Sequence, residues 1–179
     1  LFCHTHHSRF DKFKNFMDQA LSTSAEKFQK FIRTRNPIVR VRELSDSTRT
    51  ADEAAKAIGC GVAEIAKSMV FKTEEGKALL VITSGVNHVD EKKLKKLSGF
   101  SVKRADPGFV KEQTGYSIGG VPPLGHRKSV KTFMDEDLLQ YQEIWAAAGS
   151  PHAVFPIEPG CLVEWSGAVV AKIKKIKGT

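Results

Sequence analysis

A loop rich in glycine and proline is the first stretch of the sequence that could do chemistry. Residues 115–125 contain four glycines and two prolines. Glycine allows a positive φ and a close approach of a ligand to the backbone, whereas proline fixes φ and stiffens the loop. Such a loop can hold amide N–H groups in one array that suits a phosphate or the oxyanion of an acyl transfer. The composition alone also fits a rigid turn between two elements, and no Gly-Lys-Ser/Thr sequence follows that would make it a Walker loop.

A lysine set among apolar residues is the second candidate. Lys67 follows Ala66 and stands shortly before the Met-Val-Phe run at 69–71. A cation in this context either extends to solvent or serves a pocket. In a pocket its ammonium could bind a phosphate or ribose oxygen, or offset the charge of an oxyanion. About 50 residues separate Lys67 from the loop, so we expect the fold to bring them to one pocket.

Hydrophobic periodicity and capping signals predict the elements that position these residues. Helices are predicted at 24–36, 50–58, 62–66, 90–97, 106–115 and 157–165. Strands are predicted at 38–44, 68–72, 78–83, 100–104, 130–134, 143–148 and 168–173. Because strands and helices intermix without a regular βαβ repeat, the sequence predicts a single α+β domain with a mixed or antiparallel sheet.

Size and composition limit the classes of protein. The chain has 179 residues, and its net charge of +8 and pI of about 9.4 favour a polyanionic partner such as nucleic acid. No apolar run approaches the roughly 20 residues of a membrane helix. The three cysteines form no Cys-x-x-Cys pair, so we expect a cytoplasmic protein without a metal site or membrane partner. We expect residues 1–16 to be a non-native or disordered extension and residues 17–179 to be one domain.

Five short motifs together resemble the YbaK/prolyl-tRNA synthetase-associated domain family. They are Ala66-Lys67-Ser68-Met69-Val70-Phe71, Ser84-Gly85-Val86-Asn87-His88-Val89-Asp90, Ala105-Asp106-Pro107, Thr114-Gly115-Tyr116 and Gly119-Gly120-Val121-Pro122-Pro123-Leu124-Gly125. They occur in the order and spacing of that family, and the similarity runs from about residue 24 to residue 173. The Ala-Lys-Ser block and the glycine-proline block together make the resemblance specific.

The resemblance implies a fold and an activity. The fold would be a curved mixed sheet, partly closed into a barrel, with helices packed around it. The activity would be trans-editing: a free-standing protein hydrolyses the ester of mischarged aminoacyl-tRNA, such as a Pro-tRNA-type substrate, without a cofactor or metal. Aminoacyl-tRNA is the implied partner, and an aminoacyl-tRNA synthetase is a second one. Such a second sieve is needed because a synthetase pocket rejects a smaller amino acid by only about 1–3 kcal/mol per methylene.

The same resemblance assigns roles to residues. The implied catalytic set is Lys67, Gly119, Gly120, Val121, Pro122 and Pro123, with the loop amides holding the substrate carbonyl. The implied substrate-binding residues are Ser84, Gly85, Gly125, His126 and His152. The implied tRNA-binding residues are Lys92, Lys93, Arg127, Lys128 and Lys131. No serine or cysteine nucleophile with a partnered base is apparent, so we expect water to attack, positioned by backbone groups and the terminal ribose hydroxyl.

Two positions depart from the family pattern. Many of its deacylases carry Gly-x-x-Gly-x-Asp late in the chain, where this sequence reads Gly149-Ser-Pro-His152-Ala-Val154. The missing aspartate puts the Cys-tRNA specificity of those relatives in doubt, and Pro122 replaces a common serine. His126 and His152 are candidates to fill the polar space, with ordinary surface histidines as the alternative. The alternative for the whole chain is a non-catalytic module of the same fold that binds tRNA, a nucleotide or a synthetase.

Overall fold

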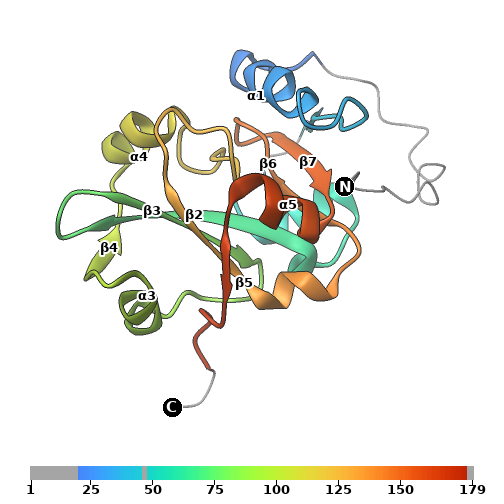
Figure 1. The fold of residues 1–179 in the computed structure, drawn as a ribbon. Coiled ribbons are helices and arrows are strands. Elements are labelled where there is room, and N and C mark those ends of the chain that lie inside the picture. Colours follow the sequence, from blue (N-terminus) through green and yellow to red (C-terminus); the bar gives the residue numbers. More distant parts are fainter. Residues whose placement is uncertain (1–19, 46–47, 177–179) are drawn as a thin grey trace.

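The computed structural model describes residues 20–45 and 48–176, whose arrangement Figure 1 shows. The extension expected at residues 1–16 lies outside these ranges. The helices are α1 (Thr23–Arg33), α2 (Ala51–Ile58), α3 (Glu91–Ser98), α4 (Pro107–Thr114) and α5 (Pro159–Ser166), with 3-10 turns η2 (Val62–Glu64) and η3 (Glu136–Gln140). The strands are β1 (Arg42–Glu43), β2 (Ile65–Thr73), β3 (Ala78–Ser84), β4 (Val102–Arg104), β5 (Lys131–Asp135), β6 (Ile144–Ala147), β7 (Ala153–Ile157) and β8 (Val169–Ala171). Every helix within the described ranges lacks the length or the apolar character that a bilayer-spanning segment requires.

The strands form one mixed sheet, with β2 and β3 running as a long ribbon through its middle (Figure 1). The strand order is β1-β7-β6-β2-β3-β5-β8, and β4 also pairs with β2. The pairs β1/β7, β6/β7, β2/β3 and β2/β4 are antiparallel, whereas β2/β6, β3/β5 and β5/β8 are parallel. Among the described residues β1 and β8 do not pair with each other, so the sheet is not closed. The predicted α+β class with a mixed sheet is confirmed.

The two edges of β2 are paired unequally. β3 pairs with β2 along residues 66–72. On the opposite edge, β6 pairs only with Ile65 and Ala66, and β4 pairs only with residues 71–73. Residues 67–70 therefore have no strand partner on this edge in the described part of the chain.

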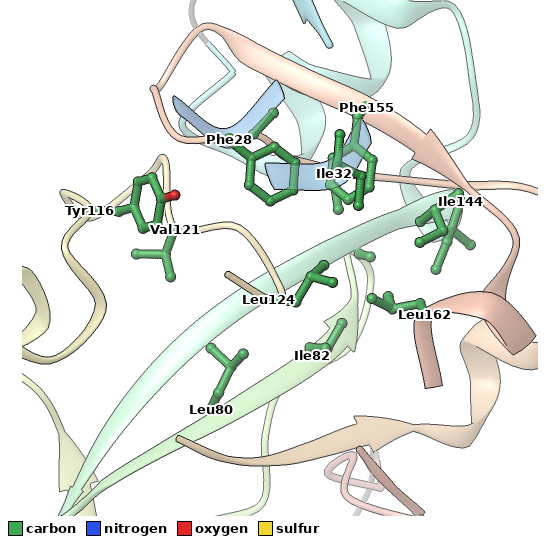
Figure 2. Close-up of a cluster of buried hydrophobic side chains, with 14 of the residues drawn as sticks. Phe28, Ile32, Leu80, Ile82, Tyr116, Val121, Leu124, Ile144, Phe155 and Leu162 are labelled. Atoms are coloured by element: carbon green, nitrogen blue, oxygen red, sulfur yellow. The ribbon is translucent and has the colours of Figure 1, made fainter. Parts of the chain in front are cut away.

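Helices cover both faces of the sheet. On one face α1 and α5 pack over β2, β3, β6 and β7, and Figure 2 shows Phe28 and Ile32 of α1 in this main core. On the other face α2 packs against Ile65 and Trp145, and α3 packs through Leu94. The alternation of side chains along β2 divides its residues between the two cores.

Local sequence signals set the helix ends as predicted. Thr50 and Glu53 form the capping box of α2, since each side chain accepts a hydrogen bond from the backbone N–H of the other residue. Gly59 then ends α2 with a φ of +80°, a conformation that glycine adopts without strain. Asp90 and Asp106 cap α3 and α4 by accepting backbone N–H bonds. Three helix starts are therefore fixed by the residues at those starts.

Several predicted elements are shorter than expected, and two of them illustrate the cause. The strand predicted at 38–44 is reduced to Arg42–Glu43, because β1 pairs with only two residues of β7. The helix predicted at 62–66 is a single 3-10 turn, after which the chain enters β2 at Ile65. In both places tertiary pairing decides where the element begins or ends.

The region before the last helix was predicted incorrectly. Residues 153–157 form β7, and α5 begins at Pro159 rather than at Ile157. Pro156 hides this strand from the sequence pattern, because proline cannot donate a ladder hydrogen bond. The strand tolerates it because β1 covers only Ala153 and Val154 on the outer edge of β7, which leaves Pro156 at an open edge.

The turn between β6 and β7 holds the glycine-proline loop in place. The carbonyl oxygen of Gly120 accepts a hydrogen bond from the N–H of Gly149 at 2.9 Å. A Cβ atom on Gly120 would lie 2.7 Å from both Cα and the carbonyl carbon of Ser150. The absence of a side chain at Gly120 therefore allows the loop and the turn to pack backbone against backbone.

Replacing Gly120 with alanine is expected to lower the free energy of unfolding by about 1–3 kcal/mol, the usual cost of overpacking. The cause is that the atoms facing the new methyl group belong to the main chain and cannot rotate away. Urea titration measures the change. Gly160→Ala is the matched control, since its Cβ would meet only Glu158 Oε1 at 3.5 Å. Equal stability of both variants would contradict this packing.

Candidate active site

A cavity of about 400 Å³ lies beside the unpaired stretch of β2. Its walls come from β2, β6, the start of α2 and the loop before Val121. The lining residues that carry polar side chains are Thr48, Arg49, Thr50, Lys67, Ser68, His88 and Arg104. The apolar lining includes Ala51, Ala54, Ile65, Ala66, Met69, Ile118, Val121, Trp145, Ala146, Ala147 and Val154. The fold thus brings Lys67 and the glycine-proline loop to one cavity, where Gly119 and Val121 represent the loop.

The conformation of the loop decides which of its amides can face a ligand. Gly119 has a φ of +87°, which requires glycine. The N–H of Gly120 donates to the carbonyl oxygen of Ser117 at 3.0 Å, so a turn already uses it. Pro122 and Pro123 have no N–H.

Several other amides of the loop donate no hydrogen bond within the described ranges. In the described part of the chain, the N–H groups of Gly119 and Val121 donate no hydrogen bond. Both residues line the cavity. A pair of fixed, unpaired N–H groups at a cavity wall is the arrangement that stabilises a carbonyl oxygen as it becomes an oxyanion.

Lys67 projects from β2 toward the loop that follows β3. Its Nζ atom donates to the carbonyl oxygens of Asn87 at 3.0 Å and Gly85 at 3.5 Å. Burial lowers the pKa of the ammonium below its ordinary value, the charge of Arg104 lowers it further, and Asp52 opposes the change. Two backbone carbonyls therefore hold a partly desolvated cation at the cavity wall.

A buried polar network fixes the loop that holds Lys67. The Asn87 side-chain amide donates to Asp135 Oδ2 at 2.7 Å and to Asp137 Oδ2 at 2.8 Å. The Thr83 hydroxyl also donates to Asp135, which is fully buried, and Lys174 pairs with Asp137. The hydrogen bonds from Lys174 and Asn87 hold the pKa of Asp137 below its usual value. The contribution of this carboxylate to stability is therefore present above the ordinary aspartate pKa and is lost as pH falls through the lower folded-state pKa.

All five residues expected to bind substrate lie outside the cavity lining. Ser84 is buried, and its hydroxyl donates to Ala63 O at 2.8 Å. Gly85 permits close packing, because a Cβ there would lie 2.3 Å from the carbonyl oxygen of Val62. Gly125 likewise permits close packing, because a Cβ there would lie 2.8 Å from ring atoms of Phe31.

The two expected histidines are also placed away from the cavity walls. His126 Nε2 lies 2.7 Å from the Pro122 carbonyl oxygen, and because a carbonyl only accepts, this nitrogen donates. Burial lowers the pKa of His126, and its bond to Pro122 opposes that shift. His152 lies in the β6–β7 turn, where its carbonyl oxygen accepts from Leu44 N. A substrate-binding role for these residues stays a prediction.

The cations at the cavity differ from those that the sequence singled out. The expected tRNA-binding residues Lys92, Lys93, Arg127, Lys128 and Lys131 do not line it. Lys128 forms an ion pair with Glu112 at 2.8 Å, and Lys93 Nζ donates to the Lys174 carbonyl oxygen at 2.8 Å.

Arg49 and Arg104 line the cavity and were missed. Arg49 directly precedes Thr50, the N-cap of α2, and Arg104 stands two residues before Asp106, the N-cap of α4. Their positions next to predicted helix starts were the signal in the sequence that could have identified them. His88 of the Ser84–Asp90 motif also lines the cavity.

Comparisons with known proteins agree with this architecture. The model of the family described as "Aminoacyl-tRNA editing domain" matches residues 45–164. The uncharacterized protein YwhH of Bacillus subtilis is 34% identical over 126 residues, which cover 70% of this chain and 80% of YwhH. The "Putative Cys-tRNA(Pro)/Cys-tRNA(Cys) deacylase EbsC" of Enterococcus faecalis is 26% identical over 132 residues, covering 72% of this chain and 79% of EbsC. The crystal structure of "a putative trans-editing enzyme for prolyl tRNA synthetase" is 46% identical, has a TM-score of 0.83, and covers 88% of this chain and 100% of that chain.

Replacing Asn87 with alanine is expected to lower the free energy of unfolding by about 1–3 kcal/mol, the cost of leaving a buried polar partner unsatisfied. Asp135 would stay buried with fewer donors. Chemical denaturation measures the change. His88→Ala is the matched control, since this neighbouring side chain is exposed and should alter stability by less than about 0.5 kcal/mol. If Asn87→Ala behaves like the control, the network does not hold the loop.

Proposed function

Because this chain belongs to the aminoacyl-tRNA editing domain family, we propose that it hydrolyses the ester bond between a wrongly attached amino acid and the 3′ end of a tRNA. The observation that carries the proposal is the juxtaposition of two unpaired amides, those of Gly119 and Val121, with the Lys67 ammonium around one cavity. The crystal structure at 46% identity is described as that of "a putative trans-editing enzyme for prolyl tRNA synthetase", which supports an activity in trans on a Pro-tRNA-type substrate.

The proposed reaction uses water as the nucleophile. Water attacks the ester carbonyl carbon and releases its first proton to bulk solvent, and the oxyanion that forms accepts hydrogen bonds from the amides of Gly119 and Val121. Collapse of this intermediate breaks the bond to the ribose oxygen, which leaves with the second proton of the water. The terminal ribose hydroxyl of the substrate would help to position the water. Lys67 would bind a phosphate or ribose oxygen of the acceptor end and offset negative charge.

The cavity lining supports a small amino acid as the wrongly attached group. Ala146 and Ala147 form one wall, and Trp145 and Val154 narrow the space beside it. The name of EbsC refers to Cys-tRNA, and Val154 stands here at the position of the family aspartate. We therefore propose a small, weakly polar side chain without assigning cysteine.

The proposed partner is aminoacyl-tRNA, and a synthetase that produces the error is a second partner. Arg49 and Arg104 at the cavity would meet the phosphates of the single-stranded 3′ end. The lysines of α3 would extend this contact, since α3 packs beside β4. Lys92, Lys93, Arg127, Lys128 and Lys131 remain the proposed contacts for the acceptor stem.

A non-catalytic binding module is the competing function. One observation favours it: in the described part of the chain no aspartate or glutamate lines the cavity, so no carboxylate base faces the proposed water. Such a module would bind aminoacyl-tRNA and release it unchanged. Incubation of the purified protein with Ala-, Cys- and Ser-charged tRNA separates the two functions, because only an enzyme hydrolyses one of them faster than buffer does.

Replacing Lys67 with alanine is expected to lower kcat/KM for deacylation tenfold or more, which corresponds to about 1.4 kcal/mol of transition-state stabilisation. The variant removes the cation that faces the cavity, and initial rates with radiolabelled mischarged tRNA measure the loss. Lys77→Ala is the control, because Lys77 is an exposed residue paired with Glu75 at a hairpin. Unchanged turnover of the Lys67 variant would exclude this lysine from the mechanism.

Replacing Arg104 with alanine is expected to weaken tRNA binding and to reduce the dependence of log K on log salt by about 0.7 for each single-strand phosphate that the protein no longer neutralises. Filter binding over a range of salt concentrations measures both. Lys103→Ala provides the comparison, since Lys103 is the adjacent exposed cation on β4 and does not line the cavity. Equal salt slopes for the two variants would argue against a phosphate contact at Arg104.

A further inference from the structure

Ser68 carries a buried hydroxyl that has no partner. Its Oγ atom is shielded from solvent and forms no hydrogen bond within the described residues, and Ser68 lines the cavity. Buried hydroxyl groups nearly always find a partner. Tyr116 carries the other unpartnered buried side-chain oxygen among these residues, but it does not line the cavity. The hydroxyl group of Ser68 can therefore form a hydrogen bond with a ligand in the cavity.

The main chain of Ser68 faces the same space. The carbonyl oxygen of Val70 accepts from the N–H of Ala105, so Val70 directs its backbone groups away from β3. In an antiparallel pair, residues two positions apart direct their N–H and C=O groups to the same edge. Ser68 therefore presents both groups to the edge of β2 that β6 and β4 leave unpaired. Its carbonyl oxygen and its Oγ atom are two acceptors on one residue.

The position of Ser68 relative to the loop matches the chemistry of an α-amino ester. Ser68 pairs with Ile82 across β2 and β3, so their side chains share a face of the sheet. Figure 2 shows Ile82 and Val121 on that face. In an α-amino ester the carbonyl carbon, whose oxygen is a hydrogen-bond acceptor, is bonded directly to the carbon that bears the ammonium group, a donor. The cavity offers donors at Gly119 and Val121 and acceptors at Ser68.

The charges around the cavity also favour Ser68 as the contact for the ammonium group of such an ester. Lys67, Arg49 and Arg104 line the cavity, and in the described ranges no carboxylate does. An ammonium group in this setting cannot form an ion pair with the wall and must rely on neutral acceptors. Since Lys67 and Ser68 are adjacent on β2, their side chains point to opposite faces of the strand. A ligand whose ammonium group binds on the Ser68 face therefore keeps that group away from the ammonium group of Lys67.

We propose that Ser68 binds the α-ammonium group of the aminoacyl moiety, through its hydroxyl and its main-chain carbonyl, and so distinguishes an aminoacyl ester from a simple acyl ester. This inference rests on the proposed function for the identity of the ligand. It assigns Ser68 a specificity role in ground-state binding, separate from the oxyanion contacts of the loop.

The test measures binding with stable analogues and does not depend on turnover. The probes are tRNA acceptor minihelices that carry alanyl, cysteinyl or seryl groups in 3′-amide linkage. Their counterparts are the propionyl, 3-mercaptopropionyl and 3-hydroxypropionyl amides, which lack only the amino group. Kd values are compared for the wild-type protein, Ser68→Ala and the control Ser129→Ala, whose serine is exposed.

We expect the wild-type protein to prefer at least one aminoacyl probe over its counterpart. Ser68→Ala should weaken the preferred aminoacyl probe about tenfold and change its counterpart less than about twofold, while Ser129→Ala should change neither. An equal loss on both members of the pair, no loss on either, or a wild-type protein that does not prefer any aminoacyl probe would overturn the inference. Failure of the proposed function gives a different result, namely an absence of hydrolysis of the ester substrates, whatever the amide probes show.

Discussion

The missing strand partner along the outer edge of β2 is the constraint on which the rest of the site depends. Along β2, the pairing with β6 ends at Ala66 and the pairing with β4 begins at Phe71. A continuous partner on this edge would occupy the space of the cavity and would consume the backbone groups of Ser68. Unpaired strand edges invite association with other chains, and proteins normally cover them. Here the edge borders a cavity whose walls include Ile118, Gly119, Val121 and the start of α2.

Close backbone contacts keep this enclosure in place. Gly120 meets the turn at Ser150, and Gly85 meets the carbonyl oxygen of Val62. Each contact joins segments that are distant in sequence, and each would be blocked by a single methyl group. Glycine loses more backbone entropy on folding than any other residue. This entropy loss occurs at Gly85 and Gly120, where the close contacts bring β2, α2 and the glycine-proline loop together.

Signals that are local in sequence predicted much of this molecule. Lys67 stands out as a cation among apolar residues, the loop stands out by its composition, and the caps of α2, α3 and α4 are correct because capping depends on residues a few positions apart. Ser68 and Arg104 could not be identified in the same way, because their importance arises from where β4 and β6 stop, and strand pairing is decided by contacts far along the chain. Proximity in sequence to the loop does not decide which histidine lines the cavity. His126 follows the loop directly, yet its ring turns back to the loop backbone, whereas His88 reaches the cavity because the β3–α3 connection runs beside Lys67.

The cavity separates the groups suited to chemistry from those suited to selection. The candidate oxyanion donors are main-chain amides, so no side chain of the cavity wall supplies them. The walls, by contrast, include side chains: Val154 lies where the family pattern has an aspartate, and Ala147 pairs with it across β6 and β7. A substitution at Val154 can therefore alter which amino acid fits without disturbing the amides of Gly119 and Val121. For this reason the loss of the family aspartate bears on the proposed choice of amino acid, while it leaves the amides of the loop and the unpaired edge of β2 in place.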